Sequence, residues 1–212
     1  MARGKKTARG YKNRTYDTKE TRKSFLIVCE GTKTEKNYFE SFKLKIKAEN
    51  FNLNVKGLGK DPQTLVREAL NIKQAEEKKG EEYDQVWCVF DRDSWTSENF
   101  NNALQNASIH DIQVAYSNEA FELWYILHFE FLNTGIPRSD YKNKLKNHLE
   151  YSYKKNSDSM YEELLNKQEV AIANAKRLLR QYNPTDPEKD NPSTTVHLLV
   201  EELNKNLPGQ NK

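Results

Sequence analysis

Two short apolar runs in this chain both end in carboxylates. Residues 25–29 are followed by Glu30, and residues 86–90 by Asp91 and, two positions on, Asp93. Both runs are rich in β-branched and aromatic residues and too short for helices, so we predict buried strands. In an open α/β sheet, ligands bind in the crevice beyond the carboxyl ends of the strands. Three carboxylates at that edge would suit a hard divalent cation such as Mg²⁺, and they indicate metal-assisted phosphoryl chemistry.

Each of these acidic residues also has a plainer interpretation. The aspartates could be a turn residue and a cap for the next helix. Glu30 favours the metal interpretation, since packing gives no reason for a carboxylate at the end of a central apolar strand. Glu35 fits a capping box in which Thr32 is the N-cap, and this structural role is the one expected for it. Glu122 lies on an apolar helix, so it must face solvent, a polar partner or the metal pocket, where it would be a further ligand or base.

Five other residues are candidates for contact with a substrate. Lys33 and Lys36 lie near the start of the helix that follows Glu30, where they could meet phosphates or simply be solvated. Ser117 and Asn118 end a further predicted strand on the same rim, although capping of the next helix would also explain them. His128 lies in an apolar segment, where a lone histidine is more often a hydrogen-bonded core residue.

The hydrophobic periodicity predicts the elements that position these residues. We expect strands at 25–29, 51–56, 86–90 and 112–116, and helices at 33–48, 62–80, 98–107 and 120–131. Asp61 and Pro62 should begin the second helix, and Thr96 or Ser97 should cap the third. This alternation predicts an α/β fold with a mainly parallel sheet of about four strands, flanked by helices.

The rest of the chain, from residue 138 on, is predicted to be mainly helical. Helices are expected at 138–150, at 160–182 and from 193 or 194 to 207. The predicted organisation is therefore a basic arm at 1–23, an α/β core at 24–135, and a helical C-terminal extension at 136–208 that packs on the core.

Charge is distributed unevenly along the 212 residues. Residues 1–23 carry a net charge of +7, which leaves −4 for the other 189 residues. Such an arm commonly engages phosphate backbones, and Tyr11 and Tyr16 could add stacking; a solvated tail is the alternative. Cys29 and Cys88 lie in predicted buried strands, as small core residues of a reducing compartment. With no apolar run of membrane-spanning length and no secretory signal, the expected location is the cytoplasm.

Several motifs, in order, resemble the RloB-like family over roughly residues 24–205. They are residues 27–31 with Thr34 and Glu35, residues 90–93, Ser117-Asn118, residues 121–124, residues 127–129 and residues 191–194. Proteins of this family are prokaryotic, are encoded near anti-phage loci and often lie beside an ABC-type ATPase. Their core is similar to the Toprim fold of topoisomerases, primases and OLD-type nucleases.

This resemblance implies a metal-dependent nuclease. Glu30 would correspond to the Toprim glutamate, as metal ligand or general acid/base, and Asp91 and Asp93 to the Asp-x-Asp that holds Mg²⁺, with Mn²⁺ as an alternative ion. Glu122 and His128 belong to the RloB-like pattern, with weaker grounds for a role. The expected partners are DNA or an RNA such as tRNA, an ABC-type ATPase and a second copy of the chain, with no membrane.

Other functions remain alternatives. A non-catalytic nucleic-acid- or partner-binding subunit on a degenerate Toprim scaffold is the main one. A haloacid-dehalogenase-like phosphatase carries its Asp-x-Asp after the first strand, followed by Thr or Val where this chain has Trp95. A metal-dependent glycosyltransferase would be unusual in so small a chain. The sequence contains no P-loop and no zinc-type Cys/His spacing.

Overall fold

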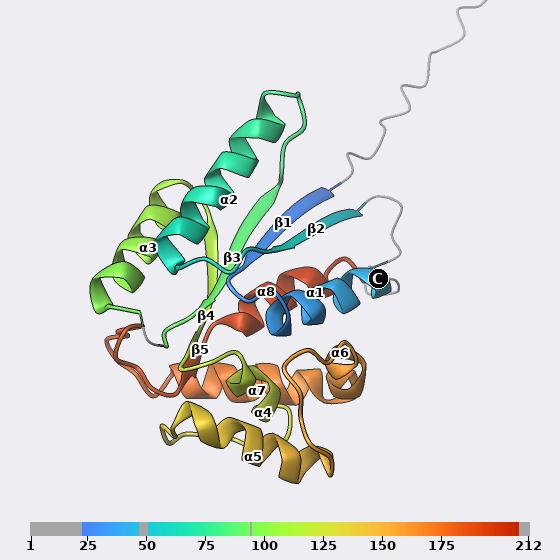
Figure 1. Ribbon diagram of the computed structural model, residues 1–212, viewed down its shortest axis with the longest axis vertical. Coiled ribbons are helices and arrows are strands. Elements are labelled where there is room, and N and C mark those ends of the chain that lie inside the picture. The colour runs from blue at the N-terminus through green and yellow to red at the C-terminus, as the bar shows by residue number, and fades with distance from the viewer. Residues whose placement is uncertain (1–22, 47–50, 94, 208–212) are drawn as a thin grey trace, which may run out of the picture.

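The computed structural model describes residues 23–46, 51–93 and 95–207. They form a five-stranded sheet with the strand order β2-β1-β3-β4-β5 (Figure 1). The strands are β1 (Lys23–Cys29), β2 (Phe51–Gly57), β3 (Gln85–Asp91), β4 (Gln113–Asn118) and β5 (Ser193–Thr194). All neighbouring strands are parallel except β4 and β5, which are antiparallel. The predicted α/β fold with a mainly parallel sheet is confirmed, and the sheet has one short strand more than expected.

Nine helical segments surround the sheet within the described residues. They are α1 (Thr34–Lys45), α2 (Pro62–Glu77), α3 (Ser97–Ile109), α4 (Glu122–Ile126), α5 (Arg138–Leu149), α6 (Met160–Leu164), the 3₁₀ helix η1 (Leu165–Lys167), α7 (Gln168–Leu179) and α8 (Val196–Asn204). None of the helices in the described part of the chain is long and apolar enough to span a membrane.

Of the predicted basic arm, only Lys23 is described, and it is the first residue of β1 rather than the last residue of an arm. The rest of the arm, including Tyr11 and Tyr16, lies outside the described residues.

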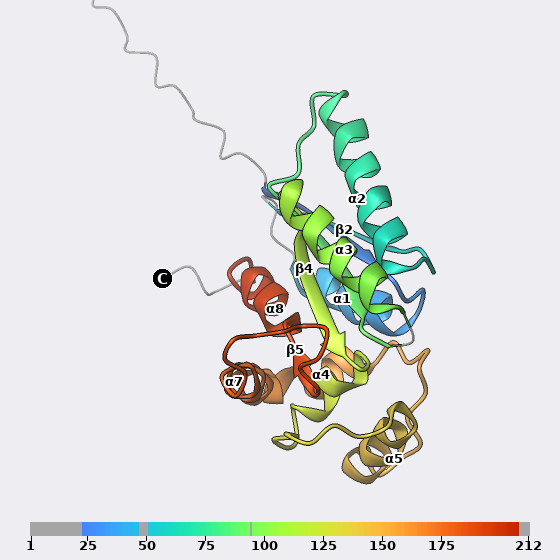
Figure 2. The same cartoon turned by 90° about the vertical axis from the view of Figure 1, so that its left-hand side faces the viewer.

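The order of the strands creates a crevice at one edge of the sheet. β2 lies on one side of β1, whereas β3 and β4 follow on the other side, so the winding of the chain reverses between β1 and β3. Helix α1 therefore lies on one face and α2 and α3 on the other, as Figures 1 and 2 show. At such a switch point the connections leave in opposite directions and open a ligand crevice outside the carboxyl ends of the strands. Those two ends carry Glu30 and Asp91.

Alternate residues of β1 pack into two hydrophobic clusters, one on each face. Leu26 and Val28 join the cluster formed with α2 and α3. Ile27 and Cys29 join the larger cluster, which includes residues of α1, α4, α5, α7 and α8. Cys29 and Cys88 are both free and buried, as expected for core residues.

Local capping explains where two helices begin. The Asp61 carboxylate accepts a hydrogen bond from the Thr64 N–H (3.1 Å), with Pro62 in the first turn of α2. The Thr96 hydroxyl accepts one from the Asn99 N–H (3.2 Å) and caps α3. Both predicted caps are confirmed, with Thr96 rather than Ser97 as the cap of α3.

The predicted capping box of α1 is wrong. Helix α1 begins at Thr34, Lys33 holds the N-cap position, and no side-chain capping bond is formed. Glu35 is 6% exposed and lines the cavity described below, so its carboxylate has a different environment from that of a capping residue.

Three C-terminal expectations also need correction. The apolar helix expected at 120–131 is only the five residues of α4, because the N–H groups of His128 and Phe129 turn to carbonyls three residues back. The helix expected at 160–182 is divided into α6, η1 and α7. Ser193 and Thr194 do not begin the last helix; they pair with Asn118 and Ser117 as β5.

Candidate metal and phosphodiester site

A cavity of about 430 Å³ lies at the carboxyl ends of β1 and β3. Carboxylates from four different elements line it: Glu30 after β1, Glu35 in α1, Asp91 at the end of β3 and Glu122 at the start of α4. Four cationic side chains, those of Lys33, Lys60, Arg138 and Lys155, also line it.

Glu30 is held by two hydrogen bonds, one from the end of β3 and one from the segment after it. Its Oε2 accepts from the Asp91 N–H (3.1 Å) and its Oε1 from the Trp95 indole N–H (2.9 Å). Its own N–H donates to the Val89 carbonyl (2.8 Å), which extends the β1–β3 pairing by one residue. Burial raises the pKa of Glu30, while the bonds from Trp95 and Asp91 oppose that rise. The carboxylate is thereby fixed over the end of β3.

Asp91 is buried near three other carboxylates of the site. It is 5% exposed, and the Arg138 Nη2 lies 3.7 Å from its Oδ2. Burial raises the pKa of Asp91 well above its usual range, and the negative charges of Glu35, Glu122 and Glu30 raise it further. A carboxyl group in this position strongly favours either a proton or a nearby cation.

Arg138 bridges the two aspartates of the Asp-x-Asp motif. Its guanidinium forms an ion pair with Asp93 through Nη1 while Nη2 faces Asp91. It is the first residue of α5, and its N–H donates to the Glu119 carboxylate (3.1 Å). Asp93 itself is not among the residues that line the cavity. No sequence motif marks this arginine, which lies in a polar segment 45 residues beyond Asp93.

Glu35 occupies space that only a glycine leaves open. A Cβ added at Gly31 would lie 1.9 Å from the Glu35 Oε2, so the carboxylate packs directly on the backbone of the Glu30–Gly31 turn. Burial, then the charges of Glu122 and Glu30, raise the pKa of Glu35 to about 7. Glu35 therefore belongs to the acidic site, contrary to its predicted capping role.

Glu122 closes the site from the side of α4. It is 3% exposed; the Tyr153 hydroxyl donates to its Oε1 (3.4 Å) and the Lys155 Nζ lies 3.3 Å from the same oxygen. Tyr153 and Lys155 come from the polar stretch between α5 and α6, where the sequence suggested no function.

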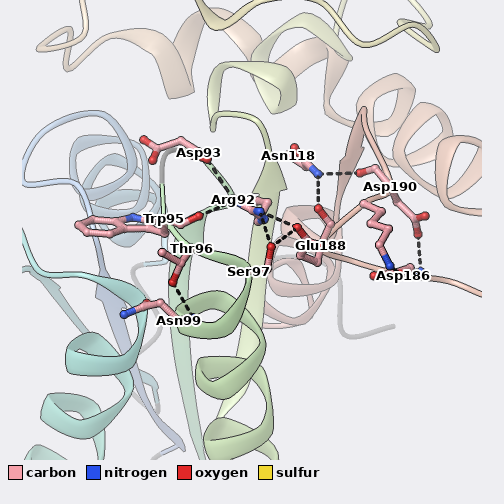
Figure 3. Close-up of polar contacts among 11 residues, drawn as sticks. Arg92, Asp93, Trp95, Thr96, Ser97, Asn99, Asn118, Asp186, Glu188 and Asp190 are labelled. Atoms are coloured by element: carbon pink, nitrogen blue, oxygen red, sulfur yellow. Dashed lines mark hydrogen bonds and ion pairs between the residues drawn. The ribbon is translucent and has the colours of Figure 1, made fainter.

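Arg92, the residue between the two aspartates, fastens this loop to another part of the chain (Figure 3). Its Nη1 donates to the carbonyls of Asp93 (3.1 Å) and Trp95 (2.7 Å). Its Nη2 donates to Glu188 Oε1 (2.6 Å), which also accepts from the Ser97 hydroxyl (2.7 Å). The loop that carries Asp93 is thus tied to the 183–192 loop.

Of the five predicted substrate contacts, only Lys33 lines the cavity. Lys36 lies beside Gly57, with its Cδ 3.1 Å from where a Cβ would be. Ser117 shares a hydrogen bond with Thr194 (3.0 Å), and the Asn118 amide donates to the Asp190 carbonyl (3.0 Å), so both hold β5 and its preceding loop.

His128 is also outside the cavity. It is 2% exposed, and its Nδ1 bonds the Trp124 carbonyl (2.8 Å). Burial lowers its pKa to about 4, which keeps the ring neutral. The structure gives His128 the environment of a core histidine.

The donor chemistry of the site fits a hard divalent cation, since Glu30, Asp91 and Asp93 offer carboxylate oxygens. As the side chains stand, however, no three acidic, histidine or cysteine groups in the described part of the chain are arranged to hold a metal ion. Instead, Arg138 forms ion pairs with Asp91 and Asp93, and Lys155 forms one with Glu122.

Comparison with known proteins identifies the family of this chain. No significant match was found among curated proteins or among solved structures. Residues 25–203 match the model of the family described as RloB-like protein, and this segment contains every carboxylate of the site. The chain therefore belongs to the RloB-like family.

Proposed function

We propose that this protein is a metal-dependent nuclease that hydrolyses nucleic-acid phosphodiesters. The observation that carries the proposal is the convergence of Glu30, Glu35, Asp91 and Glu122 on one cavity at the switch point of the sheet. Bringing four buried or half-buried acidic groups together costs folding free energy. Such clusters of perturbed carboxylates are typical of functional sites.

In this proposal Glu30, Asp91 and Asp93 would hold Mg²⁺ or Mn²⁺. When bound, the ion would act as a Lewis acid toward the phosphate and would lower the pKa of a water molecule. Glu35 has a pKa of about 7 and lines the same cavity, so it is suited to accept a proton from the attacking water at neutral pH. Arg138 is the cation best placed to exchange its aspartate partners for a phosphate oxygen.

The biological setting is proposed from the family resemblance. The nuclease would be the effector of a prokaryotic anti-phage system, in the cytoplasm, controlled by an ABC-type ATPase and acting on DNA or a structured RNA such as tRNA. A second copy of the chain would supply a second active site for cutting two strands.

The test is cleavage of plasmid DNA and total tRNA with Mg²⁺, with Mn²⁺ and with EDTA. Asp91→Asn should abolish metal-dependent cleavage. Asp111→Asn is the matched control, because Asp111 is exposed, lies before β4 at the opposite end of the sheet, and has a positive φ of 52° that asparagine tolerates. Equal cleavage by both variants would refute the assigned site.

A binding subunit without catalysis is the second candidate. It is favoured by one observation: Arg138 and Lys155 already neutralise the acidic side chains, and no metal site stands preformed among the described residues. If the wild-type protein with its ATPase partner cleaves neither substrate, and calorimetry detects no Mg²⁺ or Mn²⁺ binding, this second function replaces the first.

A further inference from the structure

A second cavity beside the acidic cavity has an excess of positive side chains in its lining. This neighbour has a volume of about 410 Å³ and is lined by Glu122, Arg138, Ser139, Lys142 and Lys155. Glu122, Arg138 and Lys155 line both cavities, so the two lie side by side and share a wall. We call the second cavity the basic groove.

The basic groove carries three cationic side chains against one carboxylate. Arg138 pairs with the aspartates and Lys155 with Glu122. Lys142 is exposed, and no ion pair is found for it among the described residues. Its charge is therefore available to a ligand.

Helix α5 sets the spacing of this positive wall. Arg138 and Lys142 are four residues apart in α5, so they lie on the same side of the helix, about one turn apart. Tyr141 and Leu145 are buried and fix the helix in the core, which keeps the cationic side facing the groove. In Figures 1 and 2, α5 lies at the end of the molecule away from α2.

We propose that the basic groove binds the phosphodiester backbone of DNA or RNA next to the position where the acidic cavity would act. This inference rests on the proposed function and specifies how its substrate is held. Lys142 would contact one backbone phosphate, and Arg138 would lie between that phosphate and the carboxylates. A lysine is suited to this role as a compact charge that accepts any base sequence.

Lys142 is the residue to change, because it has no structural partner to lose. Lys155→Gln would leave the buried Glu122 without its cation and could unfold the site. Lys43→Glu is the matched control for Lys142→Glu: Lys43 is also an exposed helical lysine, but it lines neither cavity. The two variants have the same net charge and both keep the basic arm.

Binding is measured by fluorescence anisotropy in EDTA, with labelled 20-nucleotide DNA and RNA strands in separate arms and salt varied from 50 to 200 mM. For Lys142→Glu we expect about tenfold weaker binding and a log K against log salt slope shallower by about 0.7, the value for one lost contact to a single strand. Lys43→Glu should bind as the wild type does. The arm with the larger loss identifies the preferred backbone.

The inference is overturned if both variants are weakened equally, if both match the wild type, or if the wild type binds neither probe. Because no metal is present, the result is independent of cleavage. If Lys142→Glu weakens binding but the wild type shows no metal-dependent cleavage, the basic groove is supported and the nuclease proposal is refuted. If the wild type cleaves but Lys142→Glu binds normally, the nuclease is supported and the groove is refuted.

Discussion

Arg138 supplies a positive charge next to the two carboxylates of the Asp-x-Asp motif. Its guanidinium faces both Asp91 and Asp93, while three further carboxylates raise the pKa of Asp91. The arginine therefore competes with any cation that would bind the same oxygens. Because the Arg138 side chain is 40% exposed, solvent weakens this pairing and makes exchange feasible.

Replacing Arg138 should strengthen metal binding. For Arg138→Gln we expect the affinity for Mg²⁺ or Mn²⁺ to rise about twofold to fivefold. This factor corresponds to the free energy that a half-exposed ion pair contributes. Titration calorimetry measures this, with Arg67→Gln on the exposed side of α2 as the control. Unchanged or weaker affinity would mean that the arginine does not compete with the ion.

Glu35 should make the metal-free protein less stable as the pH rises. Its pKa is raised from 4.5 to about 7, so between these values the folded state holds a proton that the unfolded state has lost. This group's contribution to the free energy of unfolding thus falls from pH 4.5 to pH 7, and the full penalty remains above pH 7.

Glu35→Gln should therefore stabilise the protein at pH 8 by about 1–3 kcal/mol and have little effect at pH 4.5. Urea denaturation of both proteins in EDTA at the two pH values checks this. Buried histidines such as His128 have a lowered pKa, so their contribution to stability changes with pH in the opposite direction. Both proteins contain them, so the difference in stability between variant and wild type removes their effect. An equal effect at both pH values would show that Glu35 is not desolvated.

At the scale of elements, the loop between β1 and α1 depends on a close backbone contact with β2. A Cβ at Gly57 would lie 2.6 Å from the Gly31 carbonyl oxygen and 2.8 Å from the Thr32 Cα. The Leu58 and Gly59 N–H groups donate to the carbonyls of Cys29 and Glu30 (3.0 and 2.8 Å), which holds the two chain segments together. The end of β2 thus sets the position of Glu30.

Gly57→Ala should displace this loop. We expect a loss of about 1–3 kcal/mol in stability from overpacking, together with weaker metal binding. Gly80→Ala is the contrast: nothing lies within 4 Å of its Cβ, but its φ of +80° should cost about 1–2 kcal/mol without affecting the metal. Thermal unfolding and calorimetry of both variants separate the two effects; equal metal affinities would exclude positioning of Glu30 by Gly57.

The Arg92–Glu188 ion pair is the second contact that positions the loop after β3. It joins the loop after β3 to the loop before β5, two segments 96 residues apart. Both side chains are largely buried, at 14% and 13% exposure, so this pair is less screened than the surface pairs of the protein.

Glu188→Gln should loosen both loops. We expect hydrogen exchange to rise about tenfold or more at the amides of residues 186–190 and 92–97, as local opening becomes easier. Glu201→Gln, which loses its 2.5 Å pair with Lys176, is the control and should leave these amides unchanged. Unaltered exchange in Glu188→Gln would show that the loops hold each other by other contacts.

At the scale of the whole molecule, the C-terminal elements share the core of the sheet. Leu199, Val200 and Leu203 of α8 are fully buried in the same cluster as Ile27 of β1 and Trp124 of α4. The division of the chain into a core at 24–135 and an extension at 136–208 stays a prediction. The apolar side chains of α8 pack in the cluster on one face of the sheet.

A chain that ends at residue 182 should therefore fail to fold. It would lose β5 and α8 and expose the face of the sheet on which α8 packs. We expect no cooperative thermal transition by circular dichroism, whereas a chain that ends at residue 207 should unfold as the full chain does. A cooperative transition in the shorter chain would show that the sheet and the preceding helices suffice.

The sequence alone determined the parallel strands, their order with the helices, and the acidic ends of β1 and β3. These follow from short-range patterns: continuous apolar runs, caps such as Asp61, and the carboxylates directly after the strands. The spacing of Glu35 from Thr32 predicts a local capping role, whereas the burial of Glu35 depends on Gly31 and on α4.

Only the tertiary structure decided what surrounds those carboxylates. Arg138 meets Asp93 across 45 residues and Arg92 meets Glu188 across 96, and no local pattern encodes such contacts. The two residues of β5 carry no strand periodicity; their pairing with β4 makes them a strand and takes Ser117 and Asn118 away from the site. Sequence thus places a side chain on an element, while its partners, and therefore its charge state and chemistry, come from segments that only folding brings together.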